Sequence, residues 1–309
     1  MTCKSSFQKL LPYFPETLRQ PLAKIPPQDA ADLQEIRLRT GRQLHAVRSG
    51  REYAVTLQGA LRAEPADGIL ITPQMLDAVF RNCCAHSLHS FQDAIRSGFL
   101  TLAGGSRAGL CGTAVMQAHK VETVRGISSI NLRIASERIG CAEALLQRLG
   151  GAAQGGLLIA GPPASGKTTV LRDIARILGD HRRICIMDER GEIAAVQNGV
   201  PQFAVGAQTD IFDGYPKAEG ISAAVRVMSP ELLICDEIGG EDETDALLHS
   251  LHTGVQIIAS AHAGSIAELY ERPQILRLIR SGVFRTAVLL QGGAACGHAA
   301  AIEPLRSSI

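Results

Sequence analysis

The chain has 309 residues, of which 46% are hydrophobic and 20% are charged. This composition excludes a disordered or fibrous protein and supplies enough apolar residues for the core of one or two domains. The formal net charge is only +1, yet residues 1–150 carry a net charge of +6 and residues 151–309 a net charge of −5, which suggests two domains. Arginine provides 14 of the 18 cations in the first half, and this favours contacts with phosphate, carboxylate or anionic surfaces.

The sequence begins without a continuous apolar segment followed by a small-residue cleavage site, which argues against a secretory signal. No stretch reaches the roughly 18 consecutive apolar residues that a membrane-spanning helix needs. We therefore expect a cytoplasmic protein.

Residues 1–150 are expected to form an α+β domain. Prolines interrupt a helical segment that extends to about residue 30. In 35–55, apolar and arginine residues alternate and glycines separate short runs, which predicts successive strands. Apolar residues at helical spacing then predict helices over 73–98.

The end of this first domain combines strands with glycine-rich turns. Residues 99–115 predict a strand, a turn with Arg107 at its tip, and a second strand. A short helix is expected over 141–149, and the glycine-rich segment 150–156 then marks the domain boundary.

Residues 151–309 alternate short apolar runs with helical stretches. The runs are uniformly apolar and flanked by turn residues, as expected of strands buried on both faces of a parallel sheet. They cover 156–160, 184–188, 231–236 and 255–260, and helices are predicted to begin at Lys167, near Lys217 and near Thr244. This pattern predicts an α/β domain.

A phosphate-binding loop follows the first of these strands. Residues 161–169 read GPPASGKTT, which fits GxxxxGK[ST] between a predicted strand and a predicted helix. Glycines let the backbone N–H groups face phosphate oxygens at the positive end of the helix. The spacing predicts that Lys167 binds the β- and γ-phosphates of ATP and that Thr168 binds Mg²⁺. The complete set of predicted nucleotide-binding residues is Gly161, Pro162, Pro163, Ala164, Ser165, Gly166, Lys167, Thr168 and Thr169.

Two carboxylates end the predicted strand 231–236. A parallel sheet places such acids beside the phosphate-binding loop. We expect Asp236 to hold magnesium through water and Glu237 to act as the general base for the attacking water. Two exposed acids without such a role are the alternative.

Two other strand ends carry polar residues toward the same edge. Asp188 ends the strand 184–188 and Glu189 follows it. Either acid can position metal or water, and the alternative is that they only stabilise the loop. Ser260 and His262 close the strand 255–260, and His262 is a candidate sensor of the γ-phosphate.

These motifs together, in this order, resemble the stage III sporulation protein AA family. The segments that carry the resemblance cover nearly the whole chain: 35–44, 99–115, 128–136, 161–169, 186–194, 213–221, 226–240 and 259–265. The resemblance implies a relationship to type II and type IV secretion ATPases, in which a RecA-like motor domain follows an N-terminal domain in hexameric rings. It further implies a cytoplasmic ATPase at a membrane, acting with membrane proteins of the channel between mother cell and forespore.

The catalytic base remains open among several acids. Secretion ATPases usually have Gly-Glu at the end of the corresponding strand and a working Glu in an acidic box, which 186–194 resembles. In this chain Asp236, Glu237 and Glu189 compete for that role. His262 stands where the family has a histidine box.

A ring motor needs a cation at the transferred phosphoryl group, where negative charge develops. Arg133 resembles the linker arginine of secretion ATPases, and Arg226 and Arg107 are further candidates. An arginine in an ordinary surface ion pair is the alternative for each.

Two other functions are compatible with the phosphate-binding motifs. A nucleic-acid translocase fits the arginine-rich half, but aromatic residues make up only 4% and tryptophan is absent, so few side chains can stack on bases and no nucleic acid is expected. A nucleotide-gated scaffold with little turnover is the other alternative.

Overall fold

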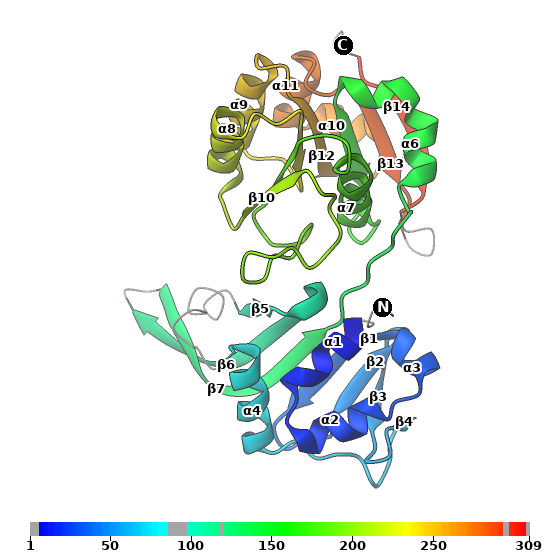
Figure 1. Ribbon diagram of the computed structural model, residues 1–309, viewed down its shortest axis with the longest axis vertical. Helices are drawn as coiled ribbons and strands as arrows, with labels where there is room; N and C mark the ends of the chain where they lie inside the picture. Colours follow the sequence, from blue (N-terminus) through cyan, green and yellow to red (C-terminus); the bar gives the residue numbers. More distant parts are fainter. Residues whose placement is uncertain (1–5, 86–97, 118–119, 293–296, 307–309) are drawn as a thin grey trace. The chain divides into compact units, whose positions relative to one another are not determined.

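The computed structural model describes residues 6–85, 98–117, 120–292 and 297–306 (Figure 1). The chain forms two compact units. The N-terminal unit comprises residues 1–136 together with 197–202, and the C-terminal unit comprises 137–196 and 203–309. No helix in the described parts of the chain has the length and apolar character to cross a membrane.

A seven-stranded antiparallel sheet, in the order β4-β3-β2-β1-β7-β6-β5, forms the N-terminal unit. Its strands are β1 (Leu33–Arg39), β2 (His45–Arg48), β3 (Arg51–Val55), β4 (Leu61–Arg62), β5 (Phe99–Thr101), β6 (Arg107–Gln117) and β7 (Lys120–Arg133). Ile36 and Leu38 are fully buried, whereas Arg37 and Arg39 are half-buried on the other face of β1. The predicted alternation is therefore confirmed.

Helices cover one face of this sheet. They are α1 (Ser6–Leu10), α2 (Glu16–Ala23), α3 (Pro27–Ala31) and α4 (Pro73–Cys83), with single 3-10 turns at η1 (Leu11–Tyr13) and η3 (Ala103–Gly105). Leucines of α1, α2 and α4 share one apolar core with the buried side chains of β1. Thr72 caps α4 by accepting a hydrogen bond from the Met75 N–H. The continuation of this predicted helical region over 86–97 lies outside the described residues.

The C-terminal unit contains a second seven-stranded sheet, in the order β10-β9-β11-β12-β8-β13-β14. Its strands are β8 (Leu157–Gly161), β9 (Ile184–Asp188), β10 (Thr209–Asp213), β11 (Leu232–Cys235), β12 (Gln256–His262), β13 (Thr286–Leu290) and β14 (Ala299–Pro304). All neighbouring pairs are parallel except β13 with β14. The predicted parallel α/β architecture is confirmed.

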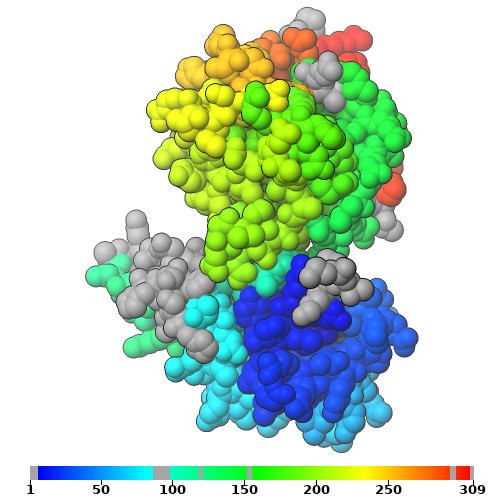
Figure 2. All heavy atoms as spheres, in the orientation of Figure 1, coloured from blue at the N-terminus to red at the C-terminus, as the bar shows by residue number. Residues whose placement is uncertain are grey.

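Helices lie on both faces of this parallel sheet. On one face, α6 (Glu143–Leu149) and α7 (Lys167–Leu178) share an apolar core with alternate strand residues, and η4 (Gly150–Gly155) leads from α6 into β8. On the other face the core includes α8 (Lys217–Val227), α9 (Glu241–Leu251), α10 (Ile266–Glu271) and α11 (Pro273–Arg280). Both faces of the central strands are thus buried, which explains their uniformly apolar sequences. The outer sides of α8 and α9 form part of the surface seen in Figure 2.

Some boundaries differ from the sequence-based expectation. Helix α6 packs into the core of the C-terminal unit, so the units divide before α6 rather than in the glycine-rich segment after it. Helix α9 begins at Glu241, where three acids occupy its first turn and complement the positive helix end. Arg107 is the first residue of β6 rather than a turn tip, with its guanidinium 5.1 Å from the ring centre of Phe99.

Candidate active site

The loop between β8 and α7 has the shape that its glycines permit. A side chain at Gly161 would place Cβ 2.5 Å from the Ser165 Oγ, closer than van der Waals contact allows. Gly166 has φ of +92° at the N-terminus of α7, a conformation that side chains disfavour. The strand, loop and helix expected around GPPASGKTT are therefore all present.

Lys167 is the first residue of α7 and is buried. Its Nζ donates to the carbonyl oxygens of Gly161 and Pro162, both at 2.9 Å, and lies 3.1 Å from the Nδ1 of His262. Burial lowers the pKa of Lys167, while the charges of Asp236 and Glu237 act in the opposite direction. The ammonium is thus held at the phosphate-binding loop, close to two carboxylates.

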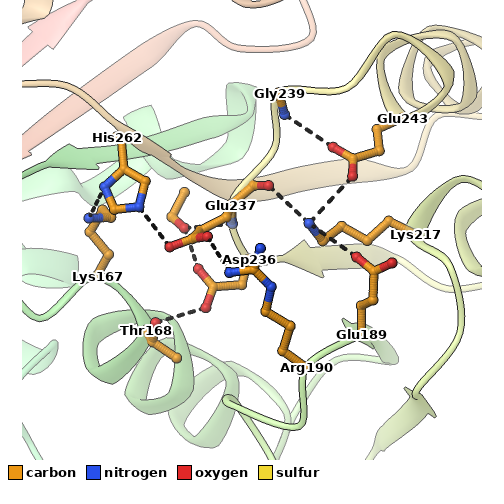
Figure 3. A network of polar contacts seen from close by, with 11 residues as sticks. Lys167, Thr168, Glu189, Arg190, Lys217, Asp236, Glu237, Gly239, Glu243 and His262 are labelled. Carbon is orange, nitrogen blue, oxygen red and sulfur yellow. Dashed lines mark hydrogen bonds and ion pairs between the residues drawn. The ribbon is translucent and has the colours of Figure 1, made fainter. Parts of the chain in front are cut away.

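A chain of hydrogen bonds runs from Lys167 through His262 to Glu237 (Figure 3). An ammonium can only donate, so Nδ1 of His262 accepts and Nε2 carries the ring proton. Nε2 lies 2.7 Å from the Oε1 of Glu237 and donates to it. His262 therefore joins the lysine of the loop to the acid that follows β11.

Asp236 follows β11 directly and is buried beside α7. Its Oδ2 accepts a hydrogen bond from the Thr168 hydroxyl at 2.7 Å, and its Oδ1 accepts one from the Ser260 hydroxyl. Burial raises the pKa of Asp236, although the hydrogen bonds from Ser260 and Thr168 oppose this effect. A buried carboxylate beside a hydroxyl is a donor set that suits a hard divalent cation such as Mg²⁺.

Glu237 is held through both its backbone and its side chain. Its backbone has φ of +46°, which is strained for a residue with a side chain. Its N–H donates to the Ser260 Oγ at 2.9 Å, and its Oε2 lies 2.8 Å from the Arg190 guanidinium. Desolvation raises the pKa of Glu237, but the hydrogen bond from His262 and the charges of Arg190 and Lys167 outweigh it and lower the pKa.

The two acids that end β9 have different surroundings. Asp188 is buried and accepts hydrogen bonds from three backbone N–H groups, those of Glu192 at 2.7 Å, Ile193 at 3.1 Å and Ala194 at 2.8 Å. It therefore stabilises the loop after β9. Glu189 is 39% exposed, and its Oε2 lies 3.5 Å from the Nζ of Lys217.

Lys217 and Arg190 also line this site, although no role was predicted for either from the sequence. They line a pocket together with residues at the ends of β9 and β11: Met187, Asp188, Glu189, Glu192, Asp236 and Glu237. One sequence signal was available for Lys217, because a lysine directly after a proline places a cation at the positive end of a helix. No comparable signal marks Arg190.

The structure brings the predicted residues of the C-terminal unit together, namely Lys167, Thr168, Glu189, Asp236, Glu237 and His262 (Figure 3). Two predicted arginines have other surroundings. Arg226 is exposed in the last turn of α8, the end opposite to Lys217. Arg133 is 70% exposed at the end of β7 in the N-terminal unit, and its Nε lies 3.9 Å from the Oε1 of Glu35.

Comparison with known proteins identifies the family. The model of the family described as "Sporulation stage III, protein AA" matches residues 7–308. The chain belongs to this family. Stage III sporulation protein AA of Bacillus subtilis (strain 168) is 37% identical over 276 residues, which are 87% of this chain and 86% of the relative.

Two solved structures share the fold. The pilus retraction motor PilT with bound ADP superposes with a TM-score of 0.56 at 14% identity, covering 85% of this chain and 75% of PilT. The ATPase DotB of Legionella pneumophila gives a TM-score of 0.52 at 16% identity, covering 84% and 72% of the two chains. The sporulation family thus has the architecture of secretion and pilus ATPases.

Proposed function

We propose that this chain is a magnesium-dependent ATPase that drives a sporulation channel complex. The observation that carries the proposal is the meeting of Lys167, Thr168, Asp236 and Glu237 at the carboxyl ends of β8 and β11 (Figure 3). A phosphate-binding loop, a buried acid beside its hydroxyl and a second acid next in sequence are the parts that ATP hydrolysis requires.

The loop from Gly161 to Thr169 would hold the phosphates of ATP. Backbone N–H groups at the start of α7 and the Lys167 ammonium supply donors and positive charge for the β- and γ-phosphates. Lys167 donates to two carbonyl oxygens of the loop and to His262, so binding ATP exchanges some of these contacts for phosphate oxygens.

Thr168 and Asp236 would hold magnesium. Both present oxygen atoms, and a bound cation would offset the desolvation that raises the pKa of the buried Asp236. When bound, magnesium neutralises charge on the β- and γ-phosphate oxygens. Few protein ligands suffice for magnesium, because water and phosphate oxygens complete its octahedron.

Glu237 would activate the attacking water. Each carboxylate oxygen can accept two hydrogen bonds, so Oε1 and Oε2 keep acceptor capacity beside His262 and Arg190. The water oxygen bonds to the γ-phosphorus as its proton passes to Glu237 and the bond from phosphorus to the bridging oxygen breaks, yielding ADP and phosphate. Glu189 is the competing base, but Lys217 engages it through an ion pair.

The wider role rests on the family and on the shared fold. We propose that the chain works as a hexameric ring at the cytoplasmic face of a membrane, with membrane proteins of the sporulation channel as partners. Membership in the sporulation family and the likeness to a pilus retraction motor support this role.

Replacement of Lys167 tests the proposed activity. Lys167→Ala removes the cation from the loop, so ATP turnover should fall by at least about 100-fold. Phosphate release by the purified full chain measures this, with Lys24→Ala, an exposed lysine of the N-terminal unit, as the control. Equal turnover in Lys167→Ala and wild type would remove the ATPase proposal.

A further inference from the structure

Lys217 is a buried lysine at a helix N-terminus, an environment that is unfavourable for a positive charge. It is the first residue of α8, and only 7% of its side chain is exposed. The positive end of the helix dipole and the loss of hydration both oppose a buried ammonium at this position. Acceptors must therefore compensate for both costs.

Three acceptors from three different segments surround the Lys217 Nζ (Figure 3). The carbonyl oxygen of Glu237 lies at 2.9 Å, the Oε1 of Glu243 at 3.4 Å and the Oε2 of Glu189 at 3.5 Å. They belong to the residue after Asp236, to the first turn of α9 and to the loop after β9. The ammonium thus ties α8 to both acidic strand ends and to α9.

The contact with Glu237 is the one that bears on chemistry. Glu237 is held in a left-handed backbone conformation, which persists only where neighbours fix it. Ser260 accepts from its N–H and Lys217 donates to its carbonyl, so the peptide groups on both sides of this residue are fixed. The other oxygen of Glu243 accepts from the N–H groups of Gly239 and Gly240, which extends the same support along the loop.

We infer that Lys217 is a positioning residue that fixes the backbone of Glu237 and thereby aims the carboxylate at the attacking water. It holds Glu189 at the same time, which keeps the second acid away from the role of base. The inference deepens the proposed ATPase function and rests on it for its kinetic consequence. Its structural content, the fixed conformation of 236–240, does not depend on hydrolysis.

Hydrogen exchange tests the structural content directly. In Lys217→Met the peptide containing 236–240 should exchange at least about 10-fold faster, because one of the two contacts that hold the backbone of Glu237 is lost. The start of α8 should not loosen, since removal of a cation from a helix N-terminus favours the helix. Glu219→Gln, an exposed change in the same first turn, serves as the control. Unchanged exchange of 236–240 in Lys217→Met overturns the inference whether or not the chain hydrolyses ATP.

Kinetics test the catalytic consequence. Misplacement of a base by about 1 Å can cost about 100-fold, so Lys217→Met should lower kcat by about 10- to 100-fold with little change in KM for ATP. In a Glu237→Gln background the same change should add almost no further loss, because a residue that acts through Glu237 has nothing left to position. A further loss of equal size in that background would overturn the inference.

Lys217→Arg guards against simple misfolding. It keeps a positive charge between Glu189 and Glu243, so the fold should survive, and kcat should recover in part because the donor toward Glu237 is restored. A well-folded Lys217→Arg variant with the exchange pattern of wild type but the kcat of Lys217→Met would contradict the positioning role. If wild type itself does not hydrolyse ATP, the ATPase proposal is overturned. Hydrogen exchange of 236–240 would still test the structural role of Lys217.

Discussion

At the residue scale, the surroundings of Glu237 determine the charge of the carboxylate that we propose as the base. Its carboxylate must be ionised to accept a proton from water. Desolvation works against the ionised form, whereas His262 and Arg190 favour it and the pKa falls below its ordinary value. Turnover should therefore be lost on the acid side as the pH falls through this lowered pKa.

Removal of Arg190 should move the loss of turnover at low pH, the acid limb of the pH profile, to higher pH. Arg190→Ala deletes a charge that lowers the pKa of Glu237, so protonation begins at a higher pH. The shift will be modest and will shrink in salt, because Arg190 is 64% exposed and solvent screens its charge. The pH dependence of kcat measures it, and Arg183→Ala, which removes an exposed arginine paired with Glu231, is the control. An acid limb that stays in place would point to Glu189 as the base.

At the scale of elements, Asp173 shows how one helix fixes another. Asp173 lies on α7, and its oxygens accept from the N–H groups of Gly140 at 3.1 Å and Ala142 at 2.8 Å, at the start of α6. Arg176 donates to the same carboxylate at 2.7 Å. These contacts attach α6 to the C-terminal unit and account for the position of the boundary between the units.

Asp173→Ala should loosen α6 selectively. Two backbone donors lose their acceptor, at a cost of about 2 kcal/mol. Native-state hydrogen exchange over 140–149 should accelerate more than exchange over β8 or β9, with Glu143→Ala, an exposed partner of Arg176, as the control. Desolvation raises the pKa of Asp173, but the hydrogen bonds of Ala142, Arg176 and Gly140 outweigh it and hold the pKa below its ordinary value, so this stabilisation is lost only as the pH falls through that lowered pKa. Uniform acceleration across the unit would argue against a local role.

The predictability of the elements followed their burial. The strands β8, β9, β11 and β12 are central and apolar on both faces, and their sequences identified them. Strand β10 is an edge strand whose residues are exposed or half-buried. Its sequence TDIFD therefore lacks the uniformly apolar run that marks the central strands. Strand β14, at the other edge, was not predicted either. Strand β13 is the exception, because it was not predicted although it lies between β8 and β14 and is mostly buried.

Site residues that form a contiguous motif could be predicted from the sequence, whereas contacts between residues far apart in the sequence could not. The phosphate-binding loop is contiguous, so its residues could be assigned from spacing alone. Lys217 meets the Glu237 carbonyl across 20 residues and Glu243 across 26, and only the fold brings these groups together. Asp188 and Glu189 were alternatives in the sequence, and the three N–H groups around Asp188 distinguish the two.

At the scale of the whole molecule, the arginine-rich half raises the question of nucleic acid. Several of its arginines are paired with acids of the same sheet, for example Arg37 with Glu35 at 2.7 Å and Arg39 with Glu52 at 3.2 Å. Pairing reduces the positive charge available to phosphates. This favours protein or nucleotide contacts for the N-terminal unit over nucleic-acid binding.

Nucleic acid should therefore bind weakly and without effect on turnover. We expect the full chain to bind single-stranded or duplex DNA no more tightly than non-specific binders, with Kd of about 10⁻⁶ M or weaker at physiological salt. Titration at several salt concentrations and ATPase assays with added DNA measure both effects. A salt-sensitive Kd well below about 10⁻⁶ M, together with stimulation of ATP turnover by DNA, would favour a translocase.

The proposed nucleotide site needs a cation at the γ-phosphoryl group, and this cation could come from another subunit of an assembly. The proposed nucleotide site has Lys167 at its loop, while Arg190 is engaged with Glu237. Arg133 is 70% exposed and has a distant ion pair with Glu35, so its guanidinium is available to another surface at little cost. We propose that Arg133 reaches nucleotide in the assembled ring, either in its own subunit or in a neighbour.

Catalysis should accordingly depend on assembly. An arginine delivered to the transferred phosphoryl group can accelerate hydrolysis by about 10³-fold or more, so specific activity should rise with protein concentration and Arg133→Ala should lower it by at least about 100-fold without unfolding the chain. Mixing Arg133→Ala with Lys167→Ala separates the two geometries. If Arg133 acts between subunits, some interfaces in mixed rings combine an intact loop with an intact arginine, and activity returns in part. If it acts within one chain, no mixed interface is complete and activity stays low. Specific activity that remains flat from monomer to oligomer would refute the shared site, because the charge on the phosphoryl group would then be stabilised within the single chain.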